Sequence, residues 1–307
     1  MLPRLALLFA TSLVNDIRTL IARHDLAAAE TMARSYQSQV GATPDLAAGL
    51  SWIARGALDS GQVDLADSYA TAARNMTLNL VRNGRIDDNP WLPLALGNSI
   101  EVQAGIMAKK GERAQAVTFL RQQLALYGTT SLGERIRKNL NIFSLEGKPA
   151  PPLDIAQWLG AKPQALASLR GKPVLIFFWA HWCSDCKAEA PILASMMRTY
   201  GPKGLTVIAP TKFYGYVARG EEAAPAVERP YIEQIRRQFY PMLDNTPIPL
   251  SASNFMMYGA STTPTIVLLD RAGIVRLYHP GAMQEQELTA QIEKLFRESG
   301  PKPRTGP

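Results

Sequence analysis

The sequence predicts two domains of different fold class, an α-helical domain of hairpin repeats followed by an α/β domain with a central mixed sheet. Three observations support this. The first half is rich in Ala, Leu and Arg at helical spacing. Residues 147–152 then read Gly-Lys-Pro-Ala-Pro-Pro, and three prolines in six residues cannot continue a helix. From there, short apolar runs alternate with helical patterns, as an α/β domain requires. A chain of 307 residues is long enough for two domains.

The N-terminal half contains a weak internal repeat. Residues 24–29, 61–66 and 111–116 align, and each is a tight turn followed by a helix whose sixth position is alanine. Their starts are 37 and 50 residues apart, whereas tetratricopeptide repeats have a period of about 34. Residues 13–143 therefore resemble a tetratricopeptide-like array, although most of that motif's Trp, Gly, Tyr and Pro positions are missing. The resemblance implies a protein partner on the repeats. A helical domain without a ligand of its own is the equal alternative.

The predicted domain boundaries follow from these patterns. We expect a helical repeat domain over residues 15–146, the α/β domain over 147–300 and a tail over 301–307. Residues 1–14 hold one arginine, a short apolar stretch and a small-residue run, which predicts a secretory signal. An ordinary first helix is the alternative. Export would place the protein in the periplasm or outside the cell, and without a signal it would be cytoplasmic.

The C-terminal half has a readable order of elements. A buried strand at Val174–Trp179 is followed by a helix from about Cys183 to Tyr200 and a second buried strand at Leu205–Ala209. The remaining predicted elements are helices at Pro230–Tyr240, Ser251–Tyr258 and Gln286–Arg297, and strands at Thr265–Leu269 and Ile274–Tyr278 that a hairpin turn joins.

The two cysteines of the chain, Cys183 and Cys186, form a Cys-x-x-Cys pair at the predicted start of a helix. A thiol in that place meets unpaired N–H groups and the positive end of the helix dipole, which favour the nucleophilic thiolate. Two cysteines are too few for a disulfide scaffold or for a tetrahedral zinc site without further ligands, and the chain has three histidines. We therefore expect a redox-active disulfide, no metal and no other cofactor. A fixed structural disulfide or a pair of inert thiols is the alternative.

Three longer motifs surround this pair. They are Gly171-Lys172-Pro173 before the apolar strand, Phe-Trp-Ala-His-Trp-Cys at 178–183 and Cys-Lys-Ala-Glu-Ala-Pro at 186–191. Together they resemble the TlpA and ResA branch of the thioredoxin fold, over roughly residues 147–298. The resemblance implies a thiol–disulfide oxidoreductase of protein substrates that reduces rather than oxidises and that receives electrons from an unknown donor protein. Cys183 would attack the substrate and Cys186 would resolve the mixed disulfide.

The same resemblance implies further site residues. The Thr263–Pro264 bond would be cis and, with Trp182, would shape the groove for a substrate peptide; a trans proline opening an edge strand is the alternative. Glu189 would help to move the proton of Cys186, unless it is a surface glutamate. Thioredoxin carries a buried Asp where this chain has Phe177, which leaves Glu189 as the substitute. Trp179 is expected in the core.

Three side chains are expected to tune the cysteines. A carboxylate at Asp185 disfavours a nearby thiolate, although it equally fits a plain N-terminal helix charge. His181 and Lys187 favour the thiolate, and His181 is expected to be solvated. The segment Phe213–Tyr240 is a long insertion for this branch, and it either shapes specificity or forms a decorated surface loop. Its aromatic residues include Tyr214, Tyr216 and Tyr231.

Composition and spacing argue against other classes of protein. The net charge of +7 comes without a run of basic residues interleaved with aromatics, so nucleic-acid binding is not expected. No apolar stretch is long enough for a stable membrane span. A peroxiredoxin-type peroxidase carries Thr or Ser three residues before its reactive cysteine, where this chain has Ala180. Sco-type copper proteins use Cys-x-x-x-Cys. The remaining alternative is a helical-repeat adaptor with a dormant thioredoxin-like domain.

Overall fold

The computed structural model describes residues 12–82 and 84–298, and the chain forms two compact units divided between Ile136 and Arg137. This division lies N-terminal to the predicted domain boundary at 146/147, which stays a prediction. The predicted signal segment falls largely outside the described residues, and the predicted tail falls wholly outside them. None of the helices in the described part of the chain is long and apolar enough to cross a membrane.

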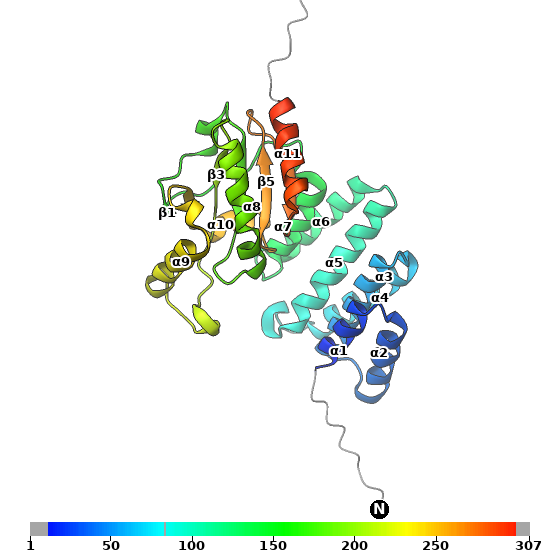
Figure 1. Cartoon of the computed structure of the whole chain (residues 1–307). Helices are drawn as coiled ribbons and strands as arrows, with labels where there is room; N and C mark the ends of the chain where they lie inside the picture. The colour runs from blue at the N-terminus through cyan, green and yellow to red at the C-terminus, as the bar shows by residue number, and fades with distance from the viewer. Residues whose placement is uncertain (1–11, 83, 299–307) are drawn as a thin grey trace, which may run out of the picture. The chain divides into compact units, whose positions relative to one another are not determined.

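The first unit consists of helices that follow one another as hairpins (Figure 1). The first three helices are capped by the side chains of Ser12, Asp25 and Thr43, each of which accepts a hydrogen bond from a backbone N–H group. The elements are α1 (Leu13–Ala22), α2 (Leu26–Val40), α3 (Pro44–Asp59), α4 (Val63–Leu80), the 3-10 turn η1 (Ile86–Asp88), α5 (Trp91–Lys109), α6 (Arg113–Tyr127) and α7 (Gly133–Ser144), whose last turns belong to the second unit.

The three turns that align in sequence also share their backbone conformation. Their first residues, His24, Gly61 and Gly111, have φ angles of 60°, 77° and 82°. In each turn the N–H of the next residue donates to the carbonyl five residues back, at 2.8–2.9 Å. The alanines at the sixth position, residues 29, 66 and 116, are all fully buried, because only a small side chain lets the helices pack closely. The equivalence of the three turns is confirmed.

The second unit contains a mixed sheet with the strand order β3-β2-β5-β6. Strand β2 runs parallel to β3 and antiparallel to β5, and β5 runs antiparallel to β6. The strands of the unit are β1 (Trp158–Gly160), β2 (Val174–Phe178), β3 (Thr206–Ile208), β4 (Pro247–Pro249), β5 (Thr265–Leu269) and β6 (Val275–Pro280). Its other elements are η2 (Leu166–Leu169), α8 (Ser184–Tyr200), η3 (Ala218–Gly220), α9 (Pro225–Phe239), η4 (Pro241–Leu243), α10 (Ala252–Tyr258) and α11 (Glu285–Glu298).

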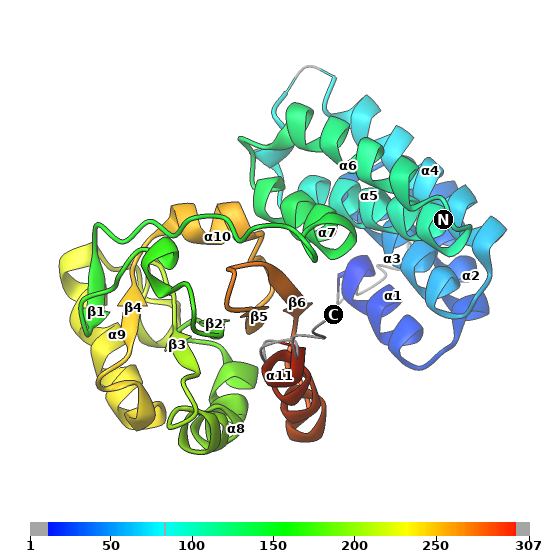
Figure 2. The ribbon, with the colours of Figure 1, turned by 90° about the horizontal axis from the view of Figure 1, so that it is seen from above.

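Both faces of this sheet are covered, which explains why β2 is apolar at every position and β5 at every position except Thr265. Leu175 and Phe177 point into a core with α8, α9 and α11, whereas Val174, Ile176 and Phe178 point into a core with α10. Figure 2 shows α10 on one side of the strands and α8 and α11 on the other. Because β2 is buried on both faces, its C-terminal end delivers the following loop from a rigid element.

The predicted α/β layout is confirmed, with two local corrections. Strands β1 and β4 form a separate antiparallel pair that was not predicted, because each has only three residues and β4 contains Pro247 and Pro249, which weaken a strand signal. Helix α9 was predicted to begin at Pro230. It begins at Pro225, which occupies the first helical turn where proline is tolerated, and Pro230 lies inside the helix.

Candidate redox-active disulfide site

The disulfide lies at the junction of β2 and α8. After β2 the chain turns through residues 179–182, and Cys183 becomes the N-cap of α8. Cys183 and Cys186 are joined in a disulfide. The backbone N–H of Cys186 donates to Cys183 Sγ at 3.0 Å, so an unpaired N–H at the helix start already points at this sulfur. The same donor would stabilise a Cys183 thiolate in the reduced protein.

The two sulfurs differ in their access to solvent. Cys183 is 3% exposed and Cys186 is fully buried, so the difference in exposure is small and has the sign expected if Cys183 is the attacking residue. Trp182 is 48% exposed beside Cys183. Trp179 is fully buried and its indole N–H donates to the Ala209 carbonyl at 2.9 Å, which confirms that it belongs to the core. Of the two sulfurs, that of Cys183 is therefore the more accessible to an attacking group, and it lies beside the exposed Trp182.

A cis peptide bond faces the disulfide from the next strand of the sheet. The Thr263–Pro264 bond is cis, as predicted. Cys183 Sγ lies 3.4 Å from the Thr263 carbonyl oxygen. The turn before β5 is held by the Thr265 hydroxyl, which donates to the Thr262 carbonyl at 2.6 Å. The structure thus brings Cys183, Thr263 and Pro264 together from separate parts of the sequence.

Glu189 lies one turn after Cys186 on α8 and is 3% exposed. Its Oε1 accepts the Met283 N–H at 3.1 Å, and its Oε2 has no hydrogen-bond partner among the described residues. Burial raises the pKa of the Glu189 carboxyl to about 7; the Met283 N–H opposes this shift and the charge of Asp185 adds to it. A buried carboxyl near neutral pKa can hold or release a proton close to Cys186.

His181 corrects the sequence prediction, because it is buried and not solvated. Its side chain is 1% exposed, and its Nε2 lies 3.2 Å from Oε1 of Glu228. Since a carboxylate can only accept, the tautomer with the proton on Nε2 makes this hydrogen bond. Burial lowers the pKa of the His181 imidazole; Glu228 opposes the shift and Lys187 adds to it. The sequence could not reveal this, because Glu228 lies 47 residues further on.

Three tyrosines of the insertion surround the His181 ring. Tyr214, Tyr216 and Tyr231 meet it edge to face, at centroid distances of 5.4, 5.4 and 5.3 Å. The insertion, whose role the sequence left open, therefore packs against the loop that carries the cysteines. The unusual number of tyrosines in this segment was the available signal, but Glu228 was missed.

The two other predicted tuning residues lie on the first turn of α8. Asp185 is exposed. The Lys187 ammonium lies 4.7 Å from the centre of the Phe239 ring. Their effect on the Cys183 thiolate remains a prediction.

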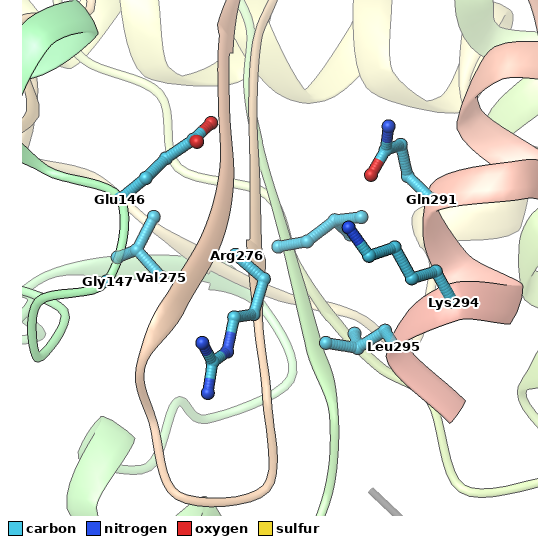
Figure 3. A pocket seen from close by; sticks show the side chains of 8 residues that line it. Glu146, Gly147, Val275, Arg276, Gln291, Lys294 and Leu295 are labelled. Carbon is cyan, nitrogen blue, oxygen red and sulfur yellow. The ribbon is translucent and has the colours of Figure 1, made fainter. Parts of the chain in front are cut away.

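A pocket elsewhere in the second unit does not include the cysteines. It has a volume of about 210 Å³ and lies against the β5–β6 hairpin, with Glu146 on one side and α11 residues on the other (Figure 3). The guanidinium of Arg276 in this pocket is paired with Asp270. The Glu146 carboxylate accepts a hydrogen bond from the Tyr278 N–H. The lining residues are Glu146, Gly147, Leu268, Val275, Arg276, Gln291, Lys294 and Leu295. Neither cysteine lines this pocket, so it is not part of the disulfide site.

A family model described as the thioredoxin-like domain matches this part of the chain, over residues 162–296. Residues 162–296 form a thioredoxin-like domain. The match includes both cysteines, Glu189, the cis-proline and the insertion. The C-terminal fold predicted from the sequence is confirmed.

Similar proteins carry names that describe thioredoxins or thiol–disulfide exchange. Thioredoxin-like protein YneN of Bacillus subtilis (strain 168) is 27% identical over 148 residues, 48% of this chain and 79% of that protein. Thiol:disulfide interchange protein DsbE of Pseudomonas fluorescens biotype C is 29% identical over 164 residues, 50% of this chain and 80% of that protein. Thiol-disulfide oxidoreductase ResA of Geobacillus thermodenitrificans (strain NG80-2) is 27% identical over 149 residues, 48% of this chain and 77% of that protein.

Proposed function

We propose that this protein is a thiol–disulfide oxidoreductase that reduces disulfide bonds in protein substrates. The observation that carries the proposal is the Cys183–Cys186 disulfide at the start of α8, with Cys183 Sγ 3.4 Å from the carbonyl before the cis-proline. The similarity of this chain to proteins named DsbE and ResA supports the same reaction.

The reaction runs in two exchange steps. In the reduced protein, the Cys183 thiolate attacks one sulfur of a substrate disulfide, a mixed disulfide forms and the other substrate sulfur leaves as a thiolate that takes up a proton. Cys186 then loses its proton and attacks Cys183 in the mixed disulfide. This closes the Cys183–Cys186 disulfide and releases the second substrate thiol. The substrate gains two electrons and two protons, and an electron-donor protein must restore the dithiol.

Glu189 is the group that we assign to the proton of Cys186. It lies three residues after Cys186, and residues at that spacing share a helix face. Its raised pKa lets it accept a proton near neutral pH, and its free Oε2 leaves room for that proton. Phe177, where thioredoxin has an acid, is buried and apolar, so it cannot take this role.

The substrate peptide is expected beside the cis-proline. Thr263 offers backbone groups at this edge, and the exposed Trp182 ring forms the neighbouring surface. An extended peptide that pairs with the Thr263 backbone would place its disulfide at the accessible sulfur of Cys183. Thr263 and Pro264 would therefore orient the substrate, and they would not exchange electrons.

The direction of electron flow follows from the reduction potential of the Cys183–Cys186 couple. We would titrate it by tryptophan fluorescence in dithiothreitol and glutathione buffers, with the Cys183→Ser and Cys186→Ser variants as controls. Thioredoxin lies at about −270 mV and the oxidant DsbA at about −120 mV. We expect a value toward the thioredoxin end. A reduction potential toward the DsbA end would make the protein an oxidase or isomerase. If the Cys183–Cys186 pair did not titrate at all, the proposed oxidoreductase activity would be refuted.

The helical unit supports a second role as a partner-binding module of the tetratricopeptide-like kind. A groove of about 500 Å³ lies along α1 and α2, lined by Leu13, Met32 and Tyr36 among others. Replacing both cysteines by serine separates the two roles, because an adaptor would keep its partner affinity whereas reduction of insulin would be lost.

We further infer a periplasmic or secreted location, with the cytoplasm as the alternative. The apolar N-terminal stretch predicted as a signal supports export. Mass spectrometry of the N-terminus of the protein purified from its native cells tests it, since an intact Met1 would contradict cleavage.

A further inference from the structure

A buried hydrogen-bonded pair joins the active-site loop to the insertion. His181 lies two residues before Cys183, and Glu228 lies in the first turn of α9. Their side chains are 1% and 0% exposed. Burying a carboxylate is costly unless it is well paired, so this arrangement persists only because other groups compensate it.

The compensating groups come from the backbone of the insertion. The Tyr214 N–H donates to Glu228 Oε1 at 2.6 Å, and the Gly215 N–H donates to Oε2 at 2.9 Å. With His181, Glu228 therefore accepts three hydrogen bonds. One carboxylate thus ties residues 214 and 215 to the loop that carries the cysteines.

The tied segment reaches the substrate side of the disulfide through aromatic contacts. The Tyr214 ring meets His181 at 5.4 Å and meets the Trp182 ring edge to face at 5.5 Å. Trp182 is half exposed and directly precedes Cys183. Any shift of the 214–215 backbone would therefore move the Tyr214 and Trp182 rings, which lie beside the reactive sulfur of Cys183.

We propose that Glu228 and His181 are positioning residues that hold Trp182 and Tyr214 as the substrate-facing wall beside Cys183, and so favour protein disulfides over small ones. This inference rests on the proposed function. The polar contacts that the structure gives these two side chains are with each other and with the insertion backbone, not with a sulfur. Glu228 and His181 therefore affect where a substrate polypeptide binds, and they leave the chemistry of sulfur exchange unchanged.

The central test compares Glu228→Gln with Glu233→Gln, a matched change on the same helix at a residue that pairs with Arg236. A glutamine has one acceptor oxygen, so it cannot accept from His181, Tyr214 and Gly215 together. The reduced proteins are mixed with insulin or with oxidised glutathione, and the rate constants of their oxidation are measured. We expect Glu228→Gln to lower the insulin rate constant about ten-fold, because small misplacements of a binding surface are costly. The glutathione value should stay within about two-fold.

The emission of Trp182 provides a readout that loss of stability alone would not reproduce. Each variant is compared with its own Trp182→Phe counterpart, and the difference spectrum isolates this residue. We expect the spectrum to move to longer wavelength in Glu228→Gln and to stay unchanged in Glu233→Gln. Equal loss of both rate constants, or an unchanged Trp182 spectrum, would overturn the positioning role.

His181 variants keep the test decisive if Glu228→Gln does not fold. A glutamine at position 181 can donate an N–H to Glu228, whereas a leucine cannot, so His181→Gln should retain the preference for insulin and His181→Leu should lose it. The same preference in both variants would contradict the inference. If the wild-type protein reduced neither disulfide, the proposed function would fail, while the Trp182 spectra would still decide whether Glu228 positions that ring.

Discussion

At the scale of single residues, Glu189 makes stability depend on pH. Its pKa is about 7 in the folded protein and 4.5 is its ordinary value, so the folded state binds the proton more tightly. The wild-type protein therefore loses stability as pH rises from about 4.5 through about 7, on the order of 3 kcal/mol. Glu189→Gln should remove this loss. Urea unfolding of the oxidised proteins at pH 4.5 and pH 8 measures it.

The exposed carboxyl of Glu287 provides the control for this measurement. Glu287→Gln should leave the difference between the two pH values as it is in the wild type. If Glu189→Gln kept the same pH dependence as the wild type, Glu189 would not be the titrating group.

Glu189→Gln should also slow the second exchange step near pH 7, because the variant lacks the carboxyl assigned to the proton of Cys186. Rapid mixing with insulin would detect this as a longer-lived mixed disulfide.

The burial of the two sulfurs predicts different behaviour of the two cysteine variants. In Cys186→Ser the attacking sulfur remains and the resolving one is gone, so a mixed disulfide between Cys183 and a protein substrate should accumulate. In Cys183→Ser the remaining thiol is fully buried, and because the reactivity of a thiol follows its access to solvent, this variant should trap about ten-fold less. Non-reducing gels with insulin measure the trapped fraction, and equal trapping by both variants would reverse the assigned roles.

At the scale of elements, the aligned turns of the helical unit differ at one residue. His24 holds a left-handed φ of 60°, which glycine adopts freely and which Gly61 and Gly111 hold in the other turns. His24→Gly should therefore stabilise the protein by about 0.5–1 kcal/mol. Gly61→Ala is the reciprocal control, and it should destabilise the protein although its Cβ would meet open space. Thermal unfolding measures both, and a destabilised His24→Gly would mean that its imidazole matters more than its backbone.

Elements whose signal is local could be predicted from the sequence. Strand β5 was predicted with its observed bounds, and β2 and α8 to within one residue, because a doubly buried strand and a helix start carrying cysteines depend on adjacent residues. The pairing of β1 with β4 could not be predicted, since it joins residues about ninety positions apart and each strand is too short to show periodicity.

The site divides in the same way. The cysteines, Glu189 and the cis-proline follow from motifs that are contiguous in the chain. The environment of His181 depends on Glu228 and on three tyrosines that the fold brings from a distant insertion. Local sequence gives no means of pairing a histidine with one particular glutamate, so burial of His181 appears only in three dimensions.

At the scale of the whole molecule, the division at Ile136 and Arg137 assigns the end of α7 to the thioredoxin-like unit. The Asn141 amide donates to the Tyr258 carbonyl at 2.8 Å, and a side chain at Gly259 would collide with the backbone of Lys138. A fragment of residues 133–307 should therefore be more stable than a fragment of 147–307, by on the order of 3 kcal/mol for the lost packing and a buried hydrogen bond. Urea unfolding compares them, and equal stability would favour the boundary at 146/147.

The hydrogen-bonded pair of His181 and Glu228 also bears on how this molecule can change over generations. A lineage that lost the acid at position 228 would leave an imidazole buried without its acceptor, and one that lost the imidazole would leave a carboxylate with a missing donor. Either first step is harmful, so the two positions are expected to be inherited together. Relatives that have shed the insertion should carry another residue in place of His181, which an alignment of natural sequences would reveal.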